Sequence, residues 1–154
     1  MNERIITLTE DLKVSYDGTI KHSNELTLIP PKTRHFKSIL TIKSIVMHAI
    51  MTQKNQMNTE QTEKANAEAQ QPQETNTQEE TVINHEIAKD FTRMILAFGD
   101  DDSLIKVMNL VKSIVTNGCA KVLEANFTQT QYEELSLEDR ELLTGGYLAA
   151  FLAI

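Results

Sequence analysis

The apolar and polar positions alternate along the first thirty residues, which predicts β-strands. Apolar residues recur at every second position through much of residues 4–29. Asp17-Gly18 interrupts this stretch, and the dipeptide favours a tight hairpin turn because both residues accept a positive φ. Pro30 and Pro31 end the last strand, since proline has no N–H to donate to a sheet. The pattern predicts an antiparallel β-meander of two to four strands, with a bulge or bend at Ser23-Asn24.

A helical period begins directly after the two prolines. The expected helix covers residues 33–51, and only Lys43 interrupts its apolar stripe. A lysine stem can lie along an apolar face while its ammonium group stays in water. Because a small meander is marginally stable alone, we expect this helix to cover the sheet. The stripe comprises Phe36, Ile39, Leu40, Val46, Met47 and Ile50.

The composition changes abruptly after this helix. Residues 53–80 contain no Val, Ile, Leu, Phe or Tyr, so they cannot bury enough apolar area to offset the entropy of ordering the chain. We predict a disordered linker, or at best a frayed helix up to Ala69, and the alternative is a helical extension that orders in a complex. The resulting plan is a β-meander with one helix at 1–52, a polar spacer at 53–81 and a helical part at 82–154. We expect the two ordered parts to pack together as one α+β domain.

Helical periodicity returns at Val82. Asn84 is suited to cap one helix, and Gly99 to end it. A second helix is expected from Leu104 to about Thr116, followed by another amphipathic piece at 119–127.

The last helix is expected to begin after Ser136, which can cap it in a box-like arrangement with Asp139. Two adjacent glycines, Gly145 and Gly146, lie in its middle. Each costs about 1 kcal/mol relative to alanine in a helix, so the sequence predicts a kink or a break there.

Charge and composition exclude several classes of function. The formal charge of −7 argues against a general nucleic-acid binder and against docking on anionic membranes. No run of about eighteen apolar residues exists, and the first residues lack the apolar region of a secretory signal. The single cysteine suits a reducing compartment. These features predict a soluble, acidic, intracellular protein.

No catalytic or metal-binding constellation is visible. The acidic cluster at 100–102 lacks the spacing of a calcium loop and fits a helix-capping role better. Cys119 fits a buried thiol. The four histidines have no partner at ligand spacing: His22, His35, His48 and His85. We therefore expect no enzyme activity, no cofactor and no metal. The basic cluster of Lys32, Arg34, Lys37 and Lys43 is either a solvated face or a surface for an acidic partner.

Several helical stripes rich in methionine and leucine could form binding surface as well as core. These stripes either pack on one another or hold the helix of another chain. The partner-binding candidates are Phe36, Ile39, Leu40, Met47, Phe91, Met94, Ile95, Phe98, Tyr147 and Phe151.

Two stretches resemble the tail assembly chaperones of tailed phages. Near the N-terminus these are IITLTEDLKVSYDGTI and NELTLIPPKTRHF, and near the C-terminus YEELSLEDRELLTGGYLAAFLAI. The resemblance covers about residues 5–47 and 132–152. It implies an opening strand, a hairpin, a strand ending in proline and then a helix.

The same resemblance implies a protein without catalysis that binds the helical tape measure protein in the host cell cytoplasm. Such a protein keeps that partner soluble, helps to recruit tail tube protein and leaves before the virion matures. In many phages a ribosomal frameshift adds a second domain. Two alternatives stay open. One is a structural or adaptor protein of the virion, at the head–tail junction or the baseplate, that forms oligomers through its meander. The other is a small enzyme or regulator.

Overall fold

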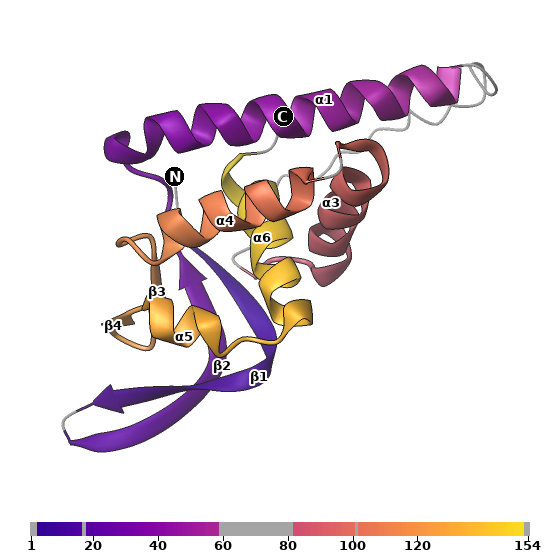
Figure 1. The fold of residues 1–154 in the computed structure, drawn as a ribbon. Helices are drawn as coiled ribbons and strands as arrows, with labels where there is room; N and C mark the ends of the chain where they lie inside the picture. The colour runs from indigo at the N-terminus through magenta and orange to yellow at the C-terminus, as the bar shows by residue number, and fades with distance from the viewer. Residues whose placement is uncertain (1–2, 17, 59–81, 101, 153–154) are drawn as a thin grey trace.

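The computed structural model describes residues 3–16, 18–58, 82–100 and 102–152 (Figure 1). It has the predicted α+β architecture, with an antiparallel sheet that starts at the N-terminus and helices in the C-terminal half. Its strands are β1 (Arg4–Tyr16), β2 (Thr19–Leu28), β3 (Ala120–Val122) and β4 (Ala125–Asn126). Its helices are η1 (Thr33–His35), α1 (Phe36–Asn58), α3 (His85–Phe98), α4 (Ser103–Val115), α5 (Gln129–Glu133) and α6 (Leu137–Phe151).

The predicted spacer at 53–81 begins inside a helix, because α1 continues to Asn58. The rest of that prediction, at 59–81, lies outside the described residues.

The four strands form one antiparallel sheet in the order β1-β2-β3-β4. The predicted hairpin joins β1 to β2, and Gly18 adopts a φ of +76°, a conformation that favours glycine. The predicted irregularity near Ser23-Asn24 exists, but its extra residues belong to the other strand. Thr7 pairs with Glu25 and Leu12 with Ser23, so four residues of β1 lie opposite Asn24 alone.

The sheet is covered by α6, and α1 lies elsewhere. Helix α6 packs on β1, α3 and α4, whereas α1 packs mainly on α3 and α4 (Figure 1). The prediction that the first helix covers the meander is therefore wrong. Residues 142–148 of α6 are all buried, so they can fill the centre of the molecule, whereas α1 has one exposed side. Residues before position 59 and residues after position 81 contribute to one hydrophobic core.

The piece at 119–127 is the hairpin β3–β4. Ala120 and Val122 are buried and Lys121 between them is less so, a period of two that suits a strand. The hairpin extends the sheet at β2, where the Ile29 N–H donates to the carbonyl of Cys119 at 2.9 Å. Leu123 turns the hairpin with a φ of 57°. A short strand with helix-like spacing of its apolar residues is easily mistaken for a helix when its pairing partner is more than ninety residues away in the sequence.

Helix α6 runs through the glycine pair without a break. A Cβ at Gly145 would overlap the carbonyl oxygen of Ala88 in α3, and a Cβ at Gly146 would lie 2.6 Å from Cδ1 of Ile6 in β1. The glycines therefore allow α6 to approach a neighbouring helix and the sheet closely. The predicted kink is absent because tertiary packing outweighs the low helix propensity of glycine.

Candidate functional site: the outer face of helix α1

Helix α1 has two apolar sides, and only one of them is buried. Its inner side packs into the core through Ile42, Val46 and Ala49, which are at most 1% exposed. Its outer side carries four large apolar side chains with substantial exposure. These are Phe36 at 61%, Leu40 at 50%, Met47 at 40% and Met51 at 56%. We call these four residues the outer stripe.

The outer stripe follows from an eleven-residue repeat in the sequence. Phe36, Leu40 and Lys43 recur as Met47, Met51 and Lys54, with the same spacing of four and then three residues. Eleven residues make almost three full turns of an α-helix, so both sets lie on one side of a straight helix. Lys43 and Lys54 are also exposed, and neither forms an ion pair within the described part of the chain.

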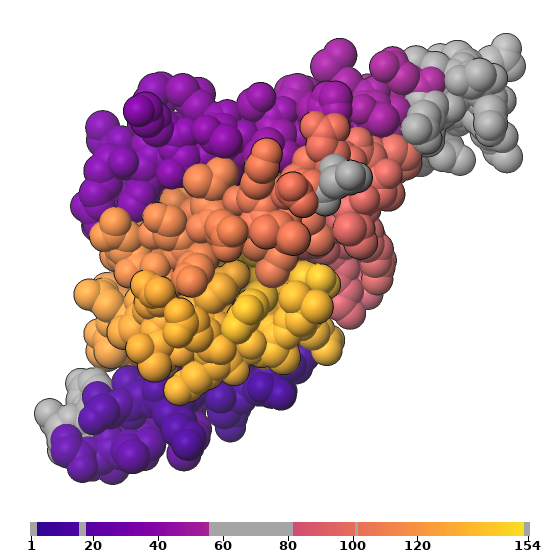
Figure 2. All heavy atoms as spheres, in the orientation of Figure 1, coloured from indigo at the N-terminus to yellow at the C-terminus, as the bar shows by residue number. Residues whose placement is uncertain are grey.

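Lys43 therefore lies between Leu40 and Met47 in the outer stripe, and Lys54 lies just beyond Met51, about 16.5 Å from Lys43 along the helix at a rise of 1.5 Å per residue. In Figures 1 and 2, α1 forms one edge of the molecule above α4.

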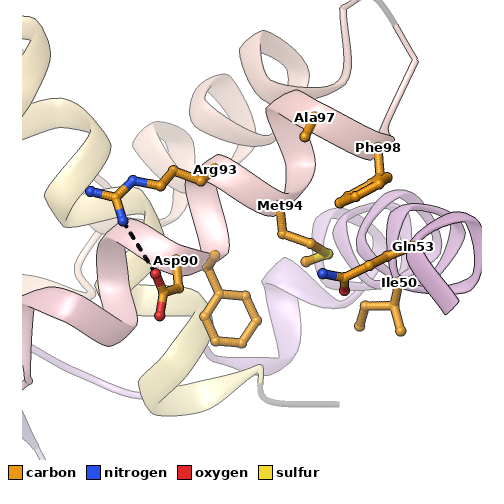
Figure 3. A pocket seen from close by; sticks show the side chains of 8 residues that line it. Ile50, Gln53, Asp90, Arg93, Met94, Ala97 and Phe98 are labelled. Atoms are coloured by element: carbon orange, nitrogen blue, oxygen red, sulfur yellow. Dashed lines mark hydrogen bonds and ion pairs between the residues drawn. The ribbon is translucent and has the colours of Figure 1, made fainter. Parts of the chain in front are cut away.

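A groove lies beside the outer stripe, between the end of α1 and α3 (Figure 3). It has a volume of about 540 Å³ and is open to solvent. Met94 and Phe98 of α3 point toward Ile50 and Gln53 of α1. Because Ile50 follows Met47 by three residues, it is next to the outer stripe on the helix surface. The apolar surface of α1 therefore continues into the groove.

One ion pair lies at the rim of this groove. Arg93 donates from Nη1 to Oδ1 of Asp90 at 3.3 Å, and both side chains are mostly exposed. An exposed pair of this kind contributes little to stability.

Comparisons with known proteins do not assign this surface. No family model, no curated protein and no solved structure matches the chain.

The ten predicted binding residues divide into three groups. Phe36, Leu40 and Met47 belong to the outer stripe, and Ile39 is half-buried on the same helix. Phe91, Met94 and Phe98 line the groove. Ile95, Tyr147 and Phe151 lie in the core, with exposures of 0%, 0% and 8%.

The three core residues are satisfied by contacts within the protein. The Tyr147 hydroxyl donates to the carbonyl of Ile29 at 2.9 Å, and its ring packs edge-on against Phe151 at 5.0 Å. We therefore assign them to the core and not to the binding surface. Met51, which was not among the candidates, belongs to the outer stripe. Its position eleven residues after Leu40 is the signal that could have identified it.

Burial in the core shifts the pKa values of Cys119, Tyr147 and His35. Burial raises the pKa of the Cys119 thiol, and its Sγ donates to the carbonyl oxygen of Pro30 at 3.7 Å, which suits the expected buried thiol. Burial raises the pKa of Tyr147 beyond the usual tyrosine range. Burial and then the nearby Arg34 charge lower the pKa of His35. A raised thiol pKa keeps Cys119 protonated at neutral pH and therefore unreactive.

The acidic and basic clusters differ in part from their predicted roles. Asp102 occupies the N-cap position of α4, but its side chain makes no capping hydrogen bond, and Asp101 lies outside the described residues. Arg34 donates from Nη2 to the carbonyl of Asn117 at 2.6 Å, so part of the basic cluster fastens η1 to the end of α4. Among the described residues, no group of three or more His, Cys, Asp or Glu side chains could hold a metal ion. No described helix is long and apolar enough to cross a bilayer.

Proposed function

We propose that this chain is a tail assembly chaperone of a tailed phage, which binds the tape measure protein through the outer stripe of α1. The observation that carries the proposal is the exposure of Phe36, Leu40, Met47 and Met51 along one side of a single helix. Contiguous exposed apolar side chains on a folded protein are typical of a surface that another chain covers. The partner would be bound in the host cell cytoplasm, and tail tube protein would be recruited to the same assembly.

The fold supports this proposal through its order of elements. The resemblance at residues 5–47 implies a strand, a hairpin, a strand ending in proline and a helix, and β1, β2, Pro30 and α1 follow in that order. The outer stripe lies on the helix that ends this stretch. The function and the resemblance thus depend on the same segment of the chain.

The outer stripe has the dimensions of a helix-binding surface. From Phe36 to Met51 it extends about 22 Å along the helix, and it is one side chain wide. Burying an exposed apolar side chain contributes about 1.5–3 kcal/mol when burial is complete. Four side chains that are about half exposed would together contribute ~3–6 kcal/mol before the entropic cost of binding, so the outer stripe by itself supports only a weak association. Weak, reversible binding suits a chaperone that must release its client.

Co-expression with the cognate tape measure protein tests the proposal. We expect that protein to remain in the soluble fraction with the wild-type chain and to precipitate without it. The double variant Phe36→Asp/Leu40→Asp should lose this protection yet keep the wild-type melting temperature, because both side chains are exposed.

The matched control is Ile105→Asp/Leu137→Asp, which introduces the same two charges at residues that are 60% and 64% exposed on α4 and α6. It should protect the client as the wild type does. A tape measure protein that is equally soluble without this chain, or equally protected by the double variant, would refute the proposal. Mass spectrometry of purified mature virions should not detect the chain, whereas its presence there would favour a structural or adaptor protein of the virion.

A further inference from the structure

We infer that the outer stripe binds a helix of acidic character, with two carboxylates about three turns apart that pair with Lys43 and Lys54. The inference rests on the proposed function, because it specifies the chemistry of the partner at that surface. The observation behind it is that both lysines lie in line with the outer stripe, Lys43 within it and Lys54 at its end. A partner that covers Phe36, Leu40, Met47 and Met51 must also cover or approach both ammonium groups.

The charge distribution along the chain favours an acidic partner. Residues 26–58 contain five of the fifteen Lys and Arg residues and none of the twenty-two Asp and Glu residues. The rest of the chain is strongly acidic. One acidic group of a neighbouring segment does reach α1: Oδ1 of Asp100 lies 3.7 Å from Nε2 of His48. His48 is about a quarter turn outside the stripe, so this contact leaves Lys43 and Lys54 available to a partner.

The spacing of the stripe specifies a helix as the partner. Its eleven-residue period is that of an almost straight helix, so a second helix could follow it without strong supercoiling. Carboxylates that face Lys43 and Lys54 would then be ten or eleven residues apart on the partner. Such pairs gain strength when apolar side chains beside them exclude water, because the effective dielectric constant falls. An unpaired lysine covered by an apolar helix would instead be desolvated at a cost.

A second copy of this chain fits the surface less well. Contact between two α1 helices would bring two segments of the same positive charge together, and like charges across an interface oppose association. The inference therefore concerns a different chain.

Binding of two designed helical peptides tests the inference, with fluorescence anisotropy as the readout. Each peptide has about 25 residues, long enough to form helix, and a leucine seam. One carries Glu at two seam positions eleven residues apart, and the other carries Lys at the same two positions. The wild-type chain should bind the Glu peptide about tenfold or more tightly than the Lys peptide at about 0.1 M salt. The difference should shrink as salt is added.

The variant Lys43→Glu/Lys54→Glu should reverse this preference. The control variant Lys13→Glu/Lys106→Glu changes the net charge equally, at exposed lysines outside α1, and should keep the wild-type preference. Both variants should retain the wild-type melting temperature. The inference is overturned if both peptides bind equally, if neither binds, or if the preference survives the reversal at Lys43 and Lys54.

Two further results would assign the surface to another occupant and also overturn the inference. One is binding to vesicles with ~30% phosphatidylserine but to neither peptide. The other is a stable dimer that Phe36→Asp/Leu40→Asp dissociates. The result of the peptide-binding experiment is independent of the result of the co-expression experiment that tests the proposed function. Selective binding of the Glu peptide without protection of the tape measure protein would uphold the inference alone, and protection without charge preference would uphold the function alone.

Discussion

Replacing Gly145 with alanine should destabilise the protein, although alanine is the better helix former. In a helix the exchange alone would stabilise by about 1 kcal/mol. Here the new methyl group would overlap the carbonyl oxygen of Ala88 and lie 2.7 Å from its carbonyl carbon. Because these are backbone atoms, α3 as a whole must move away from α6. Overpacking of this kind costs about 3 kcal/mol at the upper end of its usual range, so we expect a net loss of about 2 kcal/mol.

Gly146→Ala provides the matched control one residue away. Its methyl group would meet Cδ1 of Ile6 at 2.6 Å, the end of a side chain that can rotate. The gain in helix propensity should largely offset this smaller cost, so the stability should stay within about 1 kcal/mol of the wild type. Urea unfolding followed by circular dichroism measures both variants, and the melting temperature of Gly145→Ala should fall by about 4–8 °C. A Gly145→Ala variant at least as stable as the wild type would refute the close contact between α3 and α6.

Three other predictions concern groups in or near the core. Asp139 is fully buried and accepts hydrogen bonds from the N–H and the hydroxyl of Thr9, each at 2.9 Å. Asp139→Ala should therefore lower the free energy of unfolding in urea by about 3 kcal/mol, and Asp139→Asn should lower it by less. Equal losses in the two variants would exclude the lost acceptors as the cause. Burial lowers the pKa of His35 below its ordinary 6.5, so the unfolded chain binds more protons and stability should decrease as the pH falls through that value. His35→Gln should flatten this dependence between about pH 5 and 7, and an unchanged slope would assign it to other groups. Burial raises the pKa of the Cys119 thiol and shields it from reagents. In the folded protein, Cys119 should therefore react with a disulfide reagent at pH 8 at least about a hundredfold more slowly than in the unfolded chain. Equal rates in the two states would contradict its burial.

The elements with strong local signals could be predicted from the sequence. The hairpin at Gly18, the end of β2 before Pro30 and the Asn84 cap of α3 are all present, and the Asn84 side chain accepts from the N–H groups of Glu86 and Ile87. The Ser136 cap of α6 is also confirmed, with its hydroxyl accepting from the Asp139 N–H at 3.2 Å. In each case a few adjacent residues decide the backbone conformation. The errors arose where distant segments decide, as in the β3–β4 hairpin and the unbroken α6.

The sequence by itself determined that α1 is a helix with more apolar surface than one packed side requires, and it contains the eleven-residue repeat that places Lys43 and Lys54 in one row. It could not determine which apolar side faces the core, because Val46 and Met47 are neighbouring apolar residues on different sides of the helix, and either side could be buried. The tertiary structure decided this by packing α3 and α4 against Ile42, Val46 and Ala49 and by covering the sheet with α6 instead. Burial depends on which other elements are available to cover a face, and that is a property of the whole chain.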